Sequence, residues 1–145
     1  MRFLSRLLVS ALFFTVLAAA PAAERGLQLV APTDVATGGS ASVLISASTN
    51  HDGERVAFVH VEYSIDAGKT WQVLFYETDL GETFSRRADF AVAPTKGKAI
   101  LRARAAFRSA TGDVDYAGTP IQWDGTWAQW RTPPTRYAII YVGGR

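Results

Sequence analysis

Apolar and polar residues alternate along most of this chain with a repeat of two residues. The clearest example is segment 98–108, where Ala99, Leu101, Ala103, Ala105 and Phe107 face one way and Lys98, Arg102, Arg104 and Arg108 face the other. A two-residue repeat is typical of a β-strand that is buried on one face. The same pattern, interrupted by turn residues, predicts further strands over 27–31, 42–48, 56–64, 71–77, 85–92 and 114–123. No apolar stripe with a 3.6-residue period is long enough for a helix.

The alternation also predicts a fold and the faces that form its core. Seven short strands, spaced about 10–15 residues apart, are typical of an all-β, antiparallel sandwich of immunoglobulin or fibronectin-III type, with a flattened barrel as the alternative. We expect the bend at 31–33, around Pro32, to end an edge strand or to carry it into the other sheet. The expected inward sets are Val43, Ile45 and Ala47; Ala57, Val59, Val61 and Tyr63; Trp71, Val73 and Phe75; and Ala88, Phe90 and Val92.

The first 22 residues have the pattern of a secretory signal peptide. Two arginines and no acid lie in the first six residues, an apolar run follows over 7–20, and small residues at Ala20 and Ala22 place the expected cleavage after Ala22. The run is short for a membrane-spanning helix, which needs about 20 apolar residues, so an uncleaved anchor is the less favoured alternative. We therefore expect a periplasmic or secreted protein.

Removal of that signal peptide changes the charge of the chain. The full chain has 15 Lys and Arg residues against 13 Asp and Glu residues, and the leader holds two arginines, so the mature net charge is zero. This balance gives no reason to expect binding to nucleic acid or to an anionic membrane. The sequence has no cysteine, so the core must hold the fold without disulfides. We expect one sandwich domain over 23–123 and a Trp- and Pro-rich extension over 124–145, in which 137–142 could form an eighth strand.

One short motif is specific. Residues 64–71 read S-x-D-x-G-x-T-W, with Ser64, Asp66, Gly68, Thr70 and Trp71 at the specified positions. In such a turn Asp66 can accept hydrogen bonds from nearby backbone N–H groups, Gly68 can take a positive φ, and the Trp71 ring can lie buried beneath the turn. The motif resembles the Asp-box, a β-hairpin turn of sialidase propellers and of other exported β proteins. A propeller needs several such boxes and a longer chain, so the resemblance implies a structural hairpin and not a sialidase.

The wider stretch 59–71 resembles the central hairpin of immunoglobulin-like domains in exported bacterial proteins. It is also similar to the C-terminal dimerisation domain of sulfite-oxidase-type molybdenum enzymes. The catalytic domain of those enzymes, with its cysteine ligand, is absent from this sequence. The resemblance therefore implies a sandwich and protein–protein docking, with a homodimer as one form of it, and no redox activity.

Few residues offer catalytic or metal-binding chemistry. His51, Asp52 and Glu54 lie in one turn, where we expect a solvated loop, with a weakly held ion as the alternative, because a firm metal site needs three or four converging ligands. No glycine-rich phosphate loop precedes a helix, and no G-x-S-x-G nucleophile elbow occurs. We expect no catalytic residue, no metal and no cofactor.

A row of cations follows one face of segment 98–108. Arg102, Arg104 and Arg108 make up this row, and His60 and Glu62 share the facing side of a neighbouring strand. We expect Glu62 to pair with an arginine across the sheet. The row could hold an acidic partner or a polyanionic glycan, or it could simply be a charged stripe that keeps the sheet soluble.

The tail holds three of the four tryptophans, at Trp123, Trp127 and Trp130. Exposed tryptophans can stack on sugars or anchor a protein interface, whereas buried ones would cover the open end of a small core. The sequence leaves both alternatives open. We expect a non-catalytic binding or accessory domain of the bacterial envelope that contacts another exported protein through these tryptophans and the arginine row. A carbohydrate-binding module and a small enzyme of unrecognised type are the alternatives.

Overall fold

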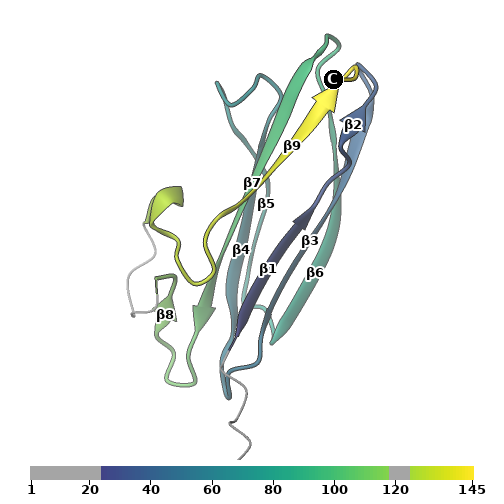
Figure 1. The fold of residues 1–145 in the computed structure, drawn as a ribbon. Helices are drawn as coiled ribbons and strands as arrows, with labels where there is room; N and C mark the ends of the chain where they lie inside the picture. The colour runs from purple at the N-terminus through teal and green to yellow at the C-terminus, as the bar shows by residue number, and fades with distance from the viewer. Residues whose placement is uncertain (1–23, 118–124) are drawn as a thin grey trace, which may run out of the picture.

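Two β-sheets packed face to face make up the computed structural model, which describes residues 24–117 and 125–145. The smaller sheet has the order β1-β3-β6, and the larger has the order β2-β9-β7-β4-β5, with β8 paired to β7 (Figure 1). The elements are β1 (Arg25–Val30), β2 (Asp34–Val35), β3 (Ser40–Thr49), β4 (Arg55–Ser64), β5 (Gln72–Thr78), β6 (Thr83–Ala91), β7 (Gly97–Arg108), β8 (Val114–Asp115), the 3-10 helix η1 (Trp127–Gln129) and β9 (Arg136–Val142). The predicted all-β, immunoglobulin-like sandwich is confirmed. The signal-peptide prediction falls outside the described residues.

The core lies between the sheets, and half of its buried residues come from the two alternating strands β3 and β7. Val43 and Ile45 of β3 and Leu101 of β7 are fully buried, as the pattern predicts. Every second side chain of a strand points to the same side, so the alternation alone places the apolar residues of these strands inward. The inward set of β7 is Ala99, Leu101, Ala103, Ala105 and Phe107, and all five belong to the core.

The chain changes sheets between β1 and β2. β1 pairs with β3 in the smaller sheet, whereas β2 runs parallel to β9 in the larger one. Pro32 lies in the bend between them, where its missing N–H removes no ladder hydrogen bond, and the N–H of Tyr141 bonds the Thr33 carbonyl 2.8 Å away. Of the two outcomes expected for the bend at 31–33, the chain shows the switch to the other sheet.

The tail strand β9 lies inside the larger sheet, between β2 and β7. Ile140 and Val142 of β9 are buried in the core, so the residues after 124 include a strand of the sandwich itself. The strand predicted over 114–123 differs more. Of its described residues, 114–117, Val114–Asp115 pairs with β7 and the Ala117 N–H donates to the Asp115 carboxylate at 3.0 Å, whereas 118–123 lie outside the described part of the chain.

Two β-bulges overturn two of the predicted faces. In β5 the pairing passes from Val61–Phe75 to Glu62–Val73, so Leu74 is the extra residue. Phe75 therefore points into the core while Val73 points outward and is 58 % exposed, although the alternation predicted a shared face. A bulge adds one residue and reverses the faces beyond it.

The second bulge lies in β4, at Ala57. Val56 pairs with Phe107 and Phe58 pairs with Ala106, which leaves Ala57 without a partner in the β7 register. Val56 thereby joins the main core, and Ala57 packs instead in a second apolar cluster with Phe58. The prediction that Ala57 shares the inward face of Val59 and Val61 was wrong for this reason.

The edge strands β5 and β6 are linked by charged and aromatic side chains. Arg86 of β6 lies opposite the core residue Ile45 and therefore points between the sheets. Its guanidinium group lies 4.6 Å from the Phe75 ring centroid of β5, and it forms an ion pair with Glu77 of the same strand. An inward-pointing charge at a sheet edge discourages pairing with another chain.

Candidate functional site

The outer face of the larger sheet brings the predicted arginine row together with β4. Arg102 lies opposite Glu62, and Arg104 lies opposite His60. Arg102 Nη2 and Glu62 Oε1 are 3.3 Å apart, so the predicted cross-strand ion pair is confirmed. Arg108 does not join this group, because its guanidinium donates to the Gly112 carbonyl at 2.8 Å in the loop that follows β7.

Tryptophan rings alternate with guanidinium groups over this face. Arg102 lies 3.9 Å from the Trp71 ring centroid and 4.4 Å from that of Trp127. Arg104 lies 4.1 Å from the Trp127 ring and 4.4 Å from the Trp130 ring. Such stacks add cation–π attraction to simple burial, and the attraction grows as the site loses water. We call these five residues, Trp71, Arg102, Trp127, Arg104 and Trp130, the Arg–Trp ladder.

Trp130 is the buried end of this ladder. Its side chain is 2 % exposed, and its Nε1 donates to the Ala105 carbonyl at 2.7 Å. The ring stacks on Tyr116 with centroids 4.4 Å apart and packs edge-on against Phe58. Trp130, which the sequence placed among the candidate binding residues, therefore belongs to the second apolar cluster and offers no surface. Trp127 is half-buried, and Trp123 lies outside the described residues.

Arg104 binds the tail to the outer face of the larger sheet. Its Nη1 donates to the Gly125 carbonyl at 2.8 Å, and the residue is only 7 % exposed. Gly125 itself lies against Tyr116, where an added Cβ would come within 2.8 Å of the ring. Only glycine allows the backbone this close. Arg102 and Arg104 are thus partly covered by the tail, and the row is not the exposed stripe that the sequence allowed.

Burial sets the protonation of the groups beneath the tail. Desolvation, with Arg104 and Arg102 nearby, lowers the pKa of His60 to about 4, and Glu62 opposes this shift only in part. Desolvation also lowers the pKa of Arg104 to about 10, still above neutrality. The face therefore carries a neutral imidazole beside a charged guanidinium at neutral pH.

The hairpin between β4 and β5 has the geometry that its motif predicts. Asp66 Oδ1 accepts from the Thr70 N–H at 2.8 Å and from Ser64 Oγ at 2.7 Å, and Asp66 Oδ2 accepts from Thr70 Oγ1 at 2.6 Å. These hydrogen bonds from Thr70 and Ser64 lower the pKa of Asp66 to about 2. Gly68 has a φ of 91°, and the half-buried Trp71 ring lies close beside it.

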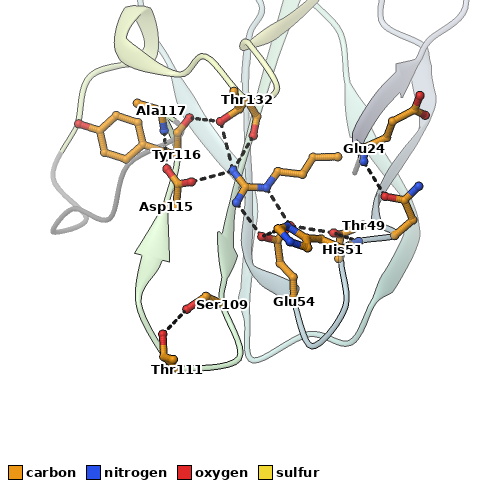
Figure 2. A network of polar contacts seen from close by, with 12 residues as sticks. Glu24, Thr49, His51, Glu54, Ser109, Thr111, Asp115, Tyr116, Ala117 and Thr132 are labelled. Carbon is orange, nitrogen blue, oxygen red and sulfur yellow. Dashed lines mark hydrogen bonds and ion pairs between the residues drawn. The ribbon is translucent and has the colours of Figure 1, made fainter. Parts of the chain in front are cut away.

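A second polar group, at the opposite end of the sandwich, was missed by the sequence analysis (Figure 2). Arg25 forms two hydrogen bonds to the Glu54 carboxylate, at 2.8 and 2.7 Å, and a third to Asp115 at 2.9 Å. Glu54 is 4 % exposed and also accepts from Thr49 at 2.7 Å. Burial alone would raise the pKa of Glu54, but the bonds from Arg25 and Thr49 outweigh it and the pKa lies below its ordinary value.

The loop 51–54 is therefore not simply solvated, because its glutamate binds Arg25 of β1, which also binds Asp115 of β8. Arg25 and Glu54 lie 29 residues apart in the chain, and a contact of that span leaves no local pattern in the sequence. Within the described residues no three His, Asp or Glu side chains gather as metal ligands, so the weak ion site considered for His51, Asp52 and Glu54 has no such cluster to support it.

Four large apolar side chains are exposed on the outer face of the larger sheet, on the two strands β5 and β9 that flank β4 and β7. Val73 is 58 % exposed, Tyr137 is 59 % exposed and Ile139 is 48 % exposed, and Tyr76 adds a fourth partly exposed ring. Register puts them on one side of the sheet, opposite Glu62, Arg102, Ile100 and His60 respectively. Among the described residues only Val30 is a further large exposed apolar side chain. We call Val73, Tyr76, Tyr137 and Ile139 the open face.

Comparison with known proteins bears on the fold. No family model and no curated protein matches this chain. A β-glucosidase from Listeria innocua solved with isofagomine has a TM-score of 0.50 at 13 % identity, over 84 % of this chain and 16 % of that one. A CARDB domain from Pyrococcus furiosus has a TM-score of 0.49 at 10 % identity, over 83 % and 94 % of the two chains. A superoxide reductase (neelaredoxin) from Ignicoccus hospitalis has a TM-score of 0.47 at 9 % identity, over 82 % and 80 %.

At these identities the likenesses concern the fold alone. Over residues 24–117 and 125–145, the structure has no helix with the length and hydropathy needed to cross a bilayer.

Proposed function

We propose that this chain is an exported, non-catalytic binding domain that holds another protein on the open face. The observation that carries the proposal is the gathering of Val73, Tyr76, Tyr137 and Ile139 on one sheet face. Val73 and Tyr76 lie on β5 and Tyr137 and Ile139 on β9, on either side of the Arg102–Glu62 pair, and exposed apolar side chains that gather around polar ones on one face are typical of an interaction site. The pattern of the first 22 residues supports export.

The Arg–Trp ladder supports this role by holding the face rigid. Arg102 is stacked between two rings and paired with Glu62, and it lies opposite Tyr137 of the neighbouring strand. A surface that is already ordered loses less conformational entropy when a partner binds. We infer that the ladder, which lies on the same outer face between the open-face residues of β5 and those of β9, orders the interface from within it.

A protein partner fits this face better than a glycan does. Val73 and Ile139 are aliphatic and give a sugar no ring on which to stack, and the two rings of the face, Tyr76 and Tyr137, are separated by β4 and β7. Of the tryptophans expected to bind sugar, Trp130 is buried. An enzymatic role has little support at His60, because its Nδ1 accepts hydrogen bonds from Arg104 at 3.1 and 3.0 Å and its ring lies against Trp127.

The proposal is tested by photo-cross-linking in the native host. A benzoylphenylalanine at Tyr137 is expected to give a discrete adduct, whereas the same residue at Ser42, exposed on the outer side of the smaller sheet, gives none. The further change Val73→Asp is expected to abolish the Tyr137 adduct. An adduct of two copies of this chain would show that the open face forms a homodimer and does not bind a different protein. Equal adducts from both positions, or none from Tyr137, would refute the proposed face.

A further inference from the structure

A cavity of about 510 Å³ opens at one end of the sandwich, between the β4–β5 hairpin and the loop that joins β6 to β7. Its lining includes Lys69, Lys96 and Lys98, with the hydroxyl-bearing residues Thr70 and Thr95 between them. Asp66 is its one acidic lining residue. The volume lies in the range of sites that take a small ligand or a few side chains.

The three lysines form no ion pair with an Asp or Glu side chain among the described residues. Lys96 Nζ lies 3.5 Å from a main-chain oxygen of Arg145, the last residue of the sequence. Lys98 Nζ lies 5.8 Å from the Tyr141 ring centroid. The Asp66 carboxylate is held by Thr70 and Ser64 within its own turn. The cavity therefore has an excess of positive charge, which its own acid does not cancel by contact.

The cavity and the open face are neighbours. Lys98 lines the cavity and lies opposite Tyr141 in the β7–β9 register, two residues along β9 from Ile139. On the other side, Thr70 lines the cavity and is followed directly by Trp71, the first ring of the Arg–Trp ladder. One bound chain can therefore contact both regions.

We propose that this cavity binds the carboxylates of an acidic segment of the partner, while apolar side chains of the same partner cover the open face. This inference rests on the proposed function, because it identifies the chemistry of that partner. Lysine ammonium groups attract carboxylates and speed the encounter, and a cationic rim selects against basic partners. A carboxylate could also come from a uronic-acid glycan. The aliphatic side chains of Val73 and Ile139 favour the protein source.

The test uses hexaglutamate as the probe and ¹⁵N-labelled protein produced from the full-length chain. We expect saturable shifts of the Lys69, Gly97 and Lys98 amides, and an apparent Kd that rises about tenfold in Lys69→Glu and in Lys98→Glu. Arg87→Glu is the matched control, since it makes the same charge change on the outer side of the smaller sheet. Its affinity for hexaglutamate should equal that of the unmodified protein.

Three results would overturn the inference. They are the absence of saturable shifts, an equal loss of affinity in Arg87→Glu, and at least tenfold tighter binding of oligogalacturonate, which would make a glycan the occupant. The two proposals also fail separately. If hexaglutamate does not bind but Val73→Asp still abolishes the Tyr137 adduct, the open face is still the binding surface and the proposal of an acidic partner segment is wrong. If hexaglutamate binds and no adduct forms, the cavity is an anion-binding site and the proposed protein partner on the open face is wrong.

Discussion

Arg104 donates two hydrogen bonds to one ring nitrogen of His60, from Nε at 3.1 Å and from Nη2 at 3.0 Å. A nitrogen that accepts from a guanidinium cannot carry a proton, so the network assigns a neutral imidazole with Nδ1 as the acceptor. His60 is also half-buried under Trp127 and edge-on to Tyr76. Protonation would bring a second cation against Arg104, and this relationship leads to a pH-dependent stability.

We predict that the protein loses stability as the pH falls from about 6.5 to about 4. The folded protein holds the pKa of His60 at about 4, against an ordinary value of 6.5, so the unfolded chain binds this proton first. The free energy of unfolding should fall by about 2 kcal/mol between pH 7.5 and pH 4.5 through His60 alone. Urea denaturation at the two pH values measures it.

His60→Gln is the matched comparison, because its amide oxygen can still accept from Arg104 and it does not titrate. Its free energy of unfolding should change less over the same interval, because it lacks the His60 titration. A residual change should remain, since carboxylates such as Glu54 titrate in both proteins. A pKa for His60 near 6.5, measured by NMR, would contradict the prediction.

Removal of Arg25 should be among the most damaging single changes. Arg25→Gln leaves the Glu54 carboxylate, 4 % exposed, without its main partner, and we expect a loss of about 3 kcal/mol in the free energy of unfolding. Arg55→Gln is the control, since Arg55 is exposed and forms no ion pair among the described residues; it should change stability by less than about 0.5 kcal/mol.

A double-mutant cycle separates the Arg25 contact from general damage. Adding Glu54→Gln to Arg25→Gln removes the stranded charge, so the double variant should be more stable than Arg25→Gln alone. Additive losses of the two single changes would show that the two side chains do not act together.

The sequence predicts the sandwich because two of its longest strands, β3 and β7, keep an unbroken alternation of apolar and polar residues. In β7 every second residue from Ala99 to Phe107 is apolar, and no bulge intervenes within the strand, so face and register follow directly. The bulges at Ala57 and Leu74 could not be predicted in the same way. One extra residue in a strand changes no residue type, and only the partner strand reveals which residue has no partner.

The candidate site was predicted in its residue types but not in its exposure. Spacing alone leaves Trp127 and Trp130 equally free to bind a ligand or to fill a core, because their burial depends on where the tail crosses the sheet. The path of the tail is fixed by the hydrogen bond from Arg104 to the Gly125 carbonyl, which joins residues 21 positions apart in the chain. The open face was missed because the bulge in β5 turns Val73 outward, and because Tyr137 and Ile139 were considered only as parts of an extra strand.

The two tail tryptophans should differ in their effect on stability. Trp130→Ala removes a ring that is 2 % exposed and leaves the Ala105 carbonyl without its hydrogen bond, so we expect a loss of about 4 kcal/mol. Trp127→Ala removes a half-buried ring that stacks on Arg102 and Arg104, and should cost about 1–2 kcal/mol. Chemical denaturation of both variants tests the order, and a greater loss in Trp127→Ala would contradict the assignment of Trp130 to the second apolar cluster.

The hairpin turn offers a test that does not depend on global stability. Thr70 gives Asp66 two hydrogen bonds, one from its hydroxyl at 2.6 Å and one from its N–H at 2.8 Å, and the pKa of Asp66 is about 2. Thr70→Val removes the hydroxyl bond and keeps the backbone one, so the pKa of Asp66 should rise part of the way toward its ordinary value of 3.8. A ¹³C-NMR titration of the carboxyl group measures the shift. Lys69→Gln is the control for nearby charge, and an unchanged pKa in Thr70→Val would mean that the hydroxyl does not hold the carboxylate in solution.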